Sequence, residues 1–312
     1  MAKDKKMILS VSRRTDIPSY YAEWFYNRIK EGLLCVRNPM NKNQISEIPL
    51  SPDIILFIVF WTKYPSEEMI KGLSNLKKYK FYFQFTLNNY GIEIEENIPN
   101  LKKRIESFKE LSKKIGKEKV IWRYDPILLN EKYTESYHFE AFEKIAKELK
   151  EYTNKVIISF IDMYAKTARN TKDLSLKEIS EEEMKKLAEG LKKIATKSEL
   201  EIESCAEKVN LDEIGIKHGA CIDKKLIEEI IGQNIKDKKD NQRDGCLCIK
   251  CDDVGKFNTC KNSCKYCYAN YNNKQVEDNY DLYDPKSSFL CDDEETNEKT
   301  KRTKRKGTIV VV

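Results

Sequence analysis

The sequence has no apolar run long enough to cross a membrane. Its longest apolar stretch, Ile54 to Trp61, has the length of a buried strand, whereas a membrane helix needs about 18 to 20 apolar residues. The apolar stretch near the N-terminus, Met7 to Val11, is too short for a signal peptide. We therefore expect a cytoplasmic protein without a membrane partner.

The chain also lacks a dominant charge and is poor in histidine. Its 57 Lys and Arg residues face 51 Asp and Glu residues, a net charge of +6, and the two signs are mostly interleaved, as on solvated helix faces. Charge alone therefore gives only weak support for a nucleic-acid partner. Of the two histidines, His138 falls in a predicted helix and is expected at the surface, while His218 lies near Cys221 and could support a metal ligand.

Cysteine, in contrast, is abundant and clustered. Eight of the ten cysteines fall between Cys205 and Cys267, and in a reducing compartment this favours metal over disulfides. Cys260, Cys264 and Cys267 have the spacing C-x3-C-x2-C, with Tyr266 before the third. Three thiolates on one loop can hold a [4Fe–4S] cube and leave one iron open. A zinc knuckle is the alternative, since soft thiolates also bind zinc.

Short β-branched or aromatic runs alternate with amphipathic segments, a pattern typical of βα units around a parallel sheet. Helix starts are predicted at Ser66, Thr134, Ser180 and Asp223. Eight strands, the number in a barrel, are predicted at Met7–Ser12, Leu34–Arg37, Ile54–Thr62, Lys80–Thr86, Val120–Tyr124, Val156–Ile161, Leu200–Ser204 and Ala220–Ile222. The prediction is an α/β fold, a TIM-like (β/α) barrel over residues 1–232.

The periodicity stops after Gly232, and two further segments follow. Residues 233–290 are predicted as a cysteine-rich, cluster-binding loop that packs on the barrel mouth and is ordered by metal. Residues 291–312 carry an acidic block followed by a basic one. They are predicted as a disordered charged tail, with a tethered contact to nucleic acid as the alternative.

A second candidate metal group consists of Cys205, Cys221, Cys246 and Cys248. Cys205 and Cys221 lie at the ends of the seventh and eighth predicted strands, so a barrel would bring both to its C-terminal face, where the loop with the other two approaches. A second metal or iron–sulfur centre is therefore predicted. The alternative is that Cys205 and Cys221 are merely small buried residues at strand ends.

Polar residues follow most predicted strands, and a barrel would gather them at one mouth. Charges there are costly unless they are paired or used. Arginines would suit a substrate carboxylate or phosphate, whereas ion pairs Arg123–Asp125 and Arg13–Asp16 are the structural alternative. The candidate catalytic set is Arg13, Arg14, Asp16, Lys63, Gln84, Arg123, Asp125 and Asp162.

The segment from Cys260 to Asn270 resembles the cluster motif of radical S-adenosylmethionine enzymes, especially spore photoproduct lyase-like members. The resemblance implies that the open iron binds S-adenosylmethionine and that the reduced cluster cleaves it to a 5′-deoxyadenosyl radical. It also implies an electron donor such as ferredoxin or flavodoxin. Here the motif follows the last predicted strand, a place that a closed barrel puts beside the first strand.

The chain to about residue 290 resembles a bacterial and archaeal family, domain of unknown function 1848. The likeness is carried by Ser10–Pro18, Phe60–Lys63, Trp122–Pro126, Asn241–Arg243 and Tyr266–Asn270. The prediction is therefore a radical S-adenosylmethionine-type enzyme with a small-molecule or nucleoside-like substrate. Alternatives are an iron–sulfur or zinc protein that binds nucleic acid without catalysis, and a hydrolase or lyase barrel whose metals only staple the loop.

Overall fold

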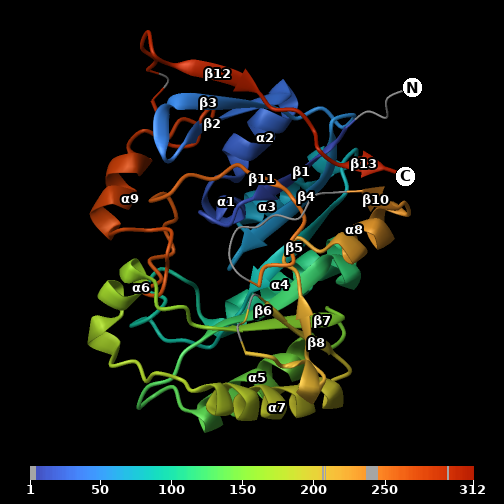
Figure 1. Ribbon diagram of the computed structural model, residues 1–312, viewed down its shortest axis with the longest axis vertical. Helices are drawn as coiled ribbons and strands as arrows, with labels where there is room; N and C mark the ends of the chain where they lie inside the picture. Colours follow the sequence, from blue (N-terminus) through green and yellow to red (C-terminus); the bar gives the residue numbers. More distant parts are fainter. Residues whose placement is uncertain (1–4, 206, 208, 237–244, 294) are drawn as a thin grey trace.

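A computed structural model describes residues 5–205, 207, 209–236, 245–293 and 295–312 (Figure 1). Asn241–Arg243, part of the family likeness, lies outside the described residues. The central element is an eight-stranded sheet in which every neighbouring pair is parallel. In spatial order its strands are β11 (Asp252–Asp253), β1 (Met7–Val11), β4 (Ile55–Thr62), β5 (Phe81–Thr86), β6 (Val120–Ile127), β7 (Lys155–Phe160), β8 (Glu201–Cys205) and β9 (Lys217–Gly219).

The α/β fold is thus present, but the closed barrel is not confirmed. Within the described ranges β9 and β11 lie at opposite edges of the sheet and do not pair with each other. The predicted strand at Leu34–Arg37 is β2 (Leu33–Asn38), which pairs with β3 (Asn41–Pro49) in a separate sheet because a tight hairpin makes neighbours antiparallel. The run Ala220–Ile222 follows β9 and is not a strand.

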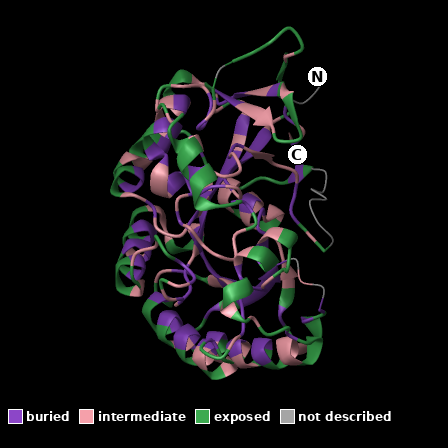
Figure 2. Ribbon diagram, turned by 90° about the vertical axis from the view of Figure 1, so that its left-hand side faces the viewer, coloured by how far each residue is buried: buried purple, intermediate pink, exposed green. Residues whose placement is uncertain are grey.

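Helices cover one face of the large sheet. Alternate strand residues, among them Leu9, Ile58 and Trp122, join the buried core beneath α2 (Ala22–Glu31), α4 (Leu101–Ile115), α5 (Glu135–Leu149) and α7 (Glu181–Lys197). These amphipathic helices bury the side toward the sheet and expose the outer side, as the peripheral helices in Figure 2 show. The predicted caps are confirmed: Ser66, Thr134, Ser180 and Asp223 each accept a first-turn amide hydrogen bond.

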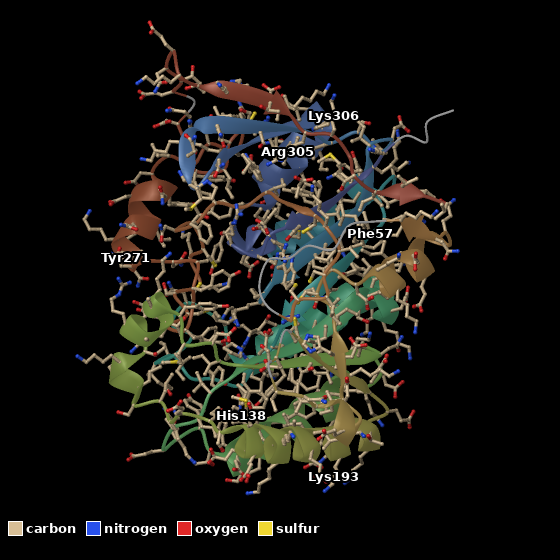
Figure 3. The ribbon with its side chains drawn as sticks, in the orientation of Figure 1. Phe57, His138, Lys193, Tyr271, Arg305 and Lys306 are labelled. Atoms are coloured by element: carbon tan, nitrogen blue, oxygen red, sulfur yellow. The ribbon has the colours of Figure 1, made fainter. Side chains whose placement is uncertain are left out.

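The chain's C-terminal third covers the opposite face. Strand residues that alternate with the first set, such as Phe57 and Ile121, form a second buried cluster with Ile227 of α8 (Lys224–Ile231), Ile249 and Ile309. Phe57 lies near the middle of the molecule in Figure 3. Apolar side chains from outside the sheet therefore cover the face that would be a barrel's interior.

The described part of the C-terminal segment contains two strands, so the prediction of a disordered tail is wrong. β12 (Lys301–Lys304) pairs with β3, and β13 (Val310–Val311) pairs with β10 (Ile235–Lys236). Ile309 is completely buried, and its backbone bonds to that of Lys6. The prediction relied on the charged composition of this segment. It missed that β12 can pair with the edge of β3 and that the apolar residue Ile309 packs in the second core. No helix among the described residues is long and apolar enough to cross a membrane.

The segment predicted as a loop before the tail also contains regular structure. It supplies the edge strand β11 and the helix α9 (Asn273–Tyr280), whose cap Asn272 accepts a hydrogen bond from the Gln275 amide. Among the described residues the remaining α-helices are α1 (Ile17–Tyr20), α3 (Glu67–Lys71) and α6 (Ala165–Asn170), and short 3-10 helices lie at Gly72–Leu76, Lys117–Lys119, Lys172–Leu174 and Asp212–Ile214. In Figure 1 α6 and α9 lie on the same side of the molecule.

Candidate active site at the carboxyl edge of the sheet

A cavity of about 420 Å³ lies where the parallel strands end. Loops after several strands of the large sheet line it, together with the cysteine segment. Of the predicted charged residues, Arg13, Arg14, Asp16, Lys63, Arg123, Asp125 and Asp162 lie in its lining. The cysteines in the lining are Cys205, Cys221, Cys246, Cys248, Cys260 and Cys267, whereas Cys264 lies outside it. The aromatic residues in the lining are Trp61, Phe160, Tyr164, Tyr266 and Tyr268. The open sheet therefore gathers most of the residues that a barrel mouth was expected to gather, with Gln84 and Cys264 as exceptions.

Asp253 of β11 organises the arginine loop that follows β1. Its carboxylate accepts hydrogen bonds from the Ser10 hydroxyl at 2.8 Å, the Ser12 hydroxyl at 2.6 Å and the Arg13 amide at 2.8 Å. The guanidinium groups of Arg13 and Arg14 lie 3.9 Å from the same carboxylate. Arg13 therefore pairs with Asp253 and not with Asp16, the partner that the structural alternative gave it. The sequence did not single out Asp253.

Asp16 is not the ion-pair partner of Arg13. Its carboxylate instead accepts hydrogen bonds from backbone amides and from one side-chain amide. It accepts the Lys63 amide at 2.8 Å, the Ser19 amide at 3.0 Å and the Asn262 side-chain amide at 3.1 Å. Burial raises the pKa of the Asp16 carboxyl despite these donors. Asp16 thereby joins the loops after β1 and β4 to the cysteine segment, which makes it a positioning residue.

Arg123 and Asp125 form the expected ion pair at the end of β6. The Arg123 Nε atom lies 2.9 Å from Asp125, and one terminal nitrogen also contacts this carboxylate. The other terminal nitrogen donates to the Cys221 sulfur at 3.2 Å. Gln84 does not reach the cavity lining: its side chain donates to the Cys221 carbonyl at 2.9 Å. Arg123 and Gln84 thus both hold Cys221.

A buried ion network supports the cysteine segment from the side of β4 and β5. Glu95 accepts hydrogen bonds from Lys63 at 2.9 Å, from Arg104 at 3.2 Å and from the Tyr266 hydroxyl. Burial alone would raise the pKa of the Glu95 carboxyl, but Lys63 and Arg104 outweigh it and hold that pKa below its usual value. An isolated β-bridge also joins Glu95 to Cys264. Glu95 therefore fixes the loop that carries the three cysteines.

Further hydrogen bonds shape this loop. The Asn270 side chain donates to the Cys260 carbonyl at 2.6 Å, and the Cys267 amide donates to the Cys264 carbonyl at 3.0 Å. The Ala269 amide lies 3.4 Å from the Cys267 sulfur. These hydrogen bonds connect residues of the three-cysteine loop to one another.

Cys260 is buried, Cys264 and Cys267 are half-buried, and burial raises the pKa of each thiol, that of Cys260 to about 12. A bound metal supplies the positive charge that favours deprotonated thiols at such a place. Across the described ranges no three His, Cys, Asp or Glu side chains converge as the ligands of a single ion would. In an iron–sulfur cluster, by contrast, each thiolate binds a separate iron, so the ligands need not converge on one ion. The loop therefore supplies three thiols that could act as metal ligands.

The histidines take other places. His138 is completely buried, so its predicted surface position is wrong; it hydrogen-bonds to the Tyr124 hydroxyl and the Leu128 carbonyl, both at 2.8 Å. In Figure 3 it lies inside the fold, whereas Lys193 lies at the outer edge. His218 contacts the Gly245 carbonyl at 2.6 Å rather than a thiol.

Two solved structures with which this chain compares are distant from it in sequence. A putative alpha-L-fucosidase from Bacteroides thetaiotaomicron is 11% identical, with a TM-score of 0.29 over 67% of this chain and 76% of that chain. Streptococcus suis SuiB bound to S-adenosylmethionine is 12% identical, with a TM-score of 0.33 over 74% of this chain and 47% of that chain. The SuiB match thus spans less than half of that protein's length. The comparison with curated proteins found no match.

The sequence itself gives a broader match. A family model described as domain of unknown function (DUF1848) matches residues 8–269, most of the 312-residue chain. The matched range includes the arginine loop after β1, the Arg123–Asp125 pair and all three residues of the C-x3-C-x2-C motif. The chain therefore belongs to the DUF1848 family.

Proposed function

We propose that this protein is an iron–sulfur enzyme of the radical S-adenosylmethionine type. Cys260, Cys264 and Cys267 would hold a [4Fe–4S] cluster, and the cavity beside them would receive the substrate. The observation that carries the proposal is that the loop with these three cysteines borders one cavity, through Cys260 and Cys267, together with charged residues from the strand ends.

Three thiolates suit this chemistry because they leave one iron of the cube without a protein ligand. With S-adenosylmethionine bound, such a reduced cluster supplies a 5′-deoxyadenosyl radical that abstracts hydrogen from a substrate. A donor such as ferredoxin or flavodoxin would provide the electron. Nearby amides, such as that of Ala269 beside the Cys267 sulfur, would stabilise the thiolates by hydrogen bonds.

The chain's own charges would bind and orient the ligands. The guanidinium groups of Arg13 and Arg14 are fixed by Asp253 and border the cavity, where they would suit a carboxylate or phosphate. Asp162 and Tyr164 line the same space and would contact polar groups of a small-molecule or nucleoside-like substrate. Tyr268 donates its hydroxyl to the Arg13 carbonyl at 2.7 Å, which ties the cysteine loop to the arginine loop.

Reductive cleavage of S-adenosylmethionine tests the proposal. The protein is isolated without oxygen, reconstituted with iron and sulfide, reduced with dithionite and assayed for 5′-deoxyadenosine. We expect product from the wild type and none from Cys264→Ala. Cys35→Ser is the matched control, since Cys35 is buried with Ile45 and Phe289 away from the cavity lining, and it should keep the activity. A wild type that binds a cluster but gives no 5′-deoxyadenosine would overturn the enzymatic part of the proposal.

A further inference from the structure

We propose that Cys205 and Cys221 form a redox-active dithiol that a low-molecular-weight disulfide oxidises to a Cys205–Cys221 disulfide. Both thiols line the cavity at the carboxyl edge of the sheet. The pair would therefore carry out thiol–disulfide exchange with a compound that enters this cavity. Such exchange does not depend on the activity proposed above or on a cluster at Cys260, Cys264 and Cys267.

The sulfur atoms of Cys205 and Cys221 are in direct contact. Cys205 ends β8 and lies opposite Gly219 of the neighbouring parallel strand β9, and Cys221 follows that strand. The two sulfurs are 2.7 Å apart, and the bond in a disulfide is about 2.05 Å long. The sulfurs therefore have to approach each other by less than about 1 Å to form that bond.

This contact distinguishes the pair from a metal site. The sequence predicted a second metal or iron–sulfur centre on Cys205, Cys221, Cys246 and Cys248. Thiolates on one zinc ion lie about 3.8 Å apart, because Zn–S bonds in a tetrahedron are about 2.3 Å long, and thiolates on separate irons of a cube lie further apart. Among the residues that the structure describes, no group of His, Cys, Asp or Glu side chains could hold a metal ion. The described geometry therefore fits exchange chemistry and not that predicted centre.

Hydrogen bonds hold the backbone beside the pair in place. The Cys221 carbonyl accepts hydrogen bonds from the Tyr82 hydroxyl at 2.6 Å and from the Gln84 side chain at 2.9 Å. The Ile249 amide donates to the Ile222 carbonyl, next to Cys221, at 3.2 Å. Because the fold already holds the two sulfurs together, closing the disulfide requires little movement of the chain.

A cation lies beside one member of the pair. Arg123, which is 5% exposed, donates to the Cys221 sulfur at 3.2 Å. The attacking group in thiol–disulfide exchange is a thiolate, and an adjacent guanidinium stabilises its negative charge. Cys221 is also the more exposed of the two, at 8% against 3% for Cys205. Cys221 is therefore the sulfur that attacks the incoming disulfide.

The exchange takes place in two steps. The Cys221 thiolate attacks one sulfur of the compound R–S–S–R, whose S–S bond breaks, so that a mixed disulfide forms on Cys221 and one R–S⁻ leaves. The Cys205 thiolate then attacks the Cys221 sulfur, the mixed disulfide breaks, and the second R–S⁻ leaves. The protons of the two cysteine thiols pass to the two released thiolates. Two electrons thus move from the cysteine pair to the compound, which leaves as two thiols.

The compound has to be small because both sulfurs lie inside the fold. They border a cavity of about 420 Å³ and are largely buried, so the disulfide of a folded protein does not reach them. Cys35 is the contrasting case of a core cysteine. It packs with Ile45 and Phe289 and lies outside the cavity lining, so it serves as the internal control.

Thiol mapping tests the proposed dithiol. The full-length wild type, Cys205→Ser, Cys221→Ser and Cys264→Ala are isolated without oxygen and incubated with glutathione disulfide. Free thiols are then alkylated, and disulfide-linked peptides are identified by mass spectrometry. In the wild type we expect a Cys205–Cys221 disulfide and the loss of both free thiols, which dithiothreitol restores, whereas Cys35 stays reduced.

The variants separate the two steps and the two proposals. Cys205→Ser should keep a glutathione mixed disulfide on Cys221, because the second thiol that would release it is absent. Cys221→Ser should leave Cys205 reduced. Cys264→Ala should form the same disulfide as the wild type although it forms no 5′-deoxyadenosine, so failure of one proposal is distinguishable from failure of the other.

Wild-type protein in which Cys205 and Cys221 both stay reduced would overturn the proposal, as would a disulfide that joins Cys221 to Cys248. A mixed disulfide on Cys205 in the Cys221→Ser variant would overturn the role of Cys221 as the attacking thiol. Circular dichroism melts check folding. If a serine variant does not fold, mapping of the wild type alone decides whether the pair forms a disulfide while Cys35 stays reduced.

Discussion

Replacement of Glu95 by Gln should destabilise the protein strongly, because two buried cations depend on this carboxylate. The side chains of Glu95 and Arg104 are 1% and 2% exposed, and that of Lys63 is 12% exposed. Glutamine has the shape of glutamate but no charge, so Lys63 and Arg104 both lose the negative charge that balances them. Breaking a buried pair in this way typically costs about 3 to 5 kcal/mol.

The neighbouring Glu93 provides a matched control. It also pairs with a lysine, Lys132, and a tyrosine, Tyr133, but its side chain is 39% exposed. Glu93→Gln should therefore cost at most about 1 kcal/mol, as expected for a surface pair. Tyr266→Phe removes one hydrogen bond and leaves the ion pairs intact, so it should cost about 1 to 2 kcal/mol.

Guanidinium unfolding of the three variants and the wild type measures these differences. The expected order of destabilisation is Glu95→Gln, then Tyr266→Phe, then Glu93→Gln. If Glu95→Gln and Glu93→Gln lose the same stability within about 0.5 kcal/mol, the buried network does not hold the cysteine loop as described here.

Three further predictions concern other parts of the molecule. Burial lowers the pKa of His138 from 6.5 to about 4, so the unfolded chain takes up a proton at a higher pH than the folded chain does. The contribution of His138 to the unfolding free energy should therefore be complete above pH 6.5 and fall by up to about 3 kcal/mol as the pH drops toward 4. Urea melts of the wild type and of His138→Gln should show this pH dependence only in the wild type. Truncation after Leu290 removes buried Ile309 and two strands, so unfolding free energy should fall by at least about 2 kcal/mol; an unchanged melt would refute the packing of the tail. Arg123→Met should lower the unfolding free energy by about 3 kcal/mol because it leaves Asp125 without its cationic partner. Arg14→Met, at a side chain that is 25% exposed, should lower it by less than about 1 kcal/mol. Equal losses of stability for the two variants in thermal melts would contradict this prediction.

The parallel strands were predictable from sequence because their apolar runs are short, β-branched and aromatic. β1, β4, β5, β6, β7 and β8 all fall within a residue or a few of the predicted ranges. The hairpin of β2 and β3 was misplaced because an isolated apolar run does not reveal whether its neighbour is parallel or antiparallel. The sequence also could not show whether the sheet closes into a barrel. The edge strand β11 has only two residues, Asp252–Asp253, which is too short for a periodic pattern of apolar residues.

Site residues could be predicted where polar or charged residues directly follow a strand. They could not be predicted where a residue acts through a contact with a partner far away in the sequence. Asp253 lies in a two-residue strand and Glu95 in an isolated bridge, and their partners Ser12 and Tyr266 are 241 and 171 positions away. No local pattern indicates such pairs. A signal did exist for His138, which shares the helix spacing of the buried residues Ala141, Phe142 and Ile145 on α5.

The central claim is that the loop with Cys260, Cys264 and Cys267 holds an iron–sulfur cluster. Iron and acid-labile sulfide, measured per chain after anaerobic isolation of the wild type and of Cys260→Ala/Cys264→Ala/Cys267→Ala, test it most directly. We predict equal amounts of iron and sulfide in the wild type and a loss of about four irons per chain in the variant, with its melting temperature little changed. Wild-type protein that contains zinc without sulfide, or a folded variant with undiminished iron, would contradict the account.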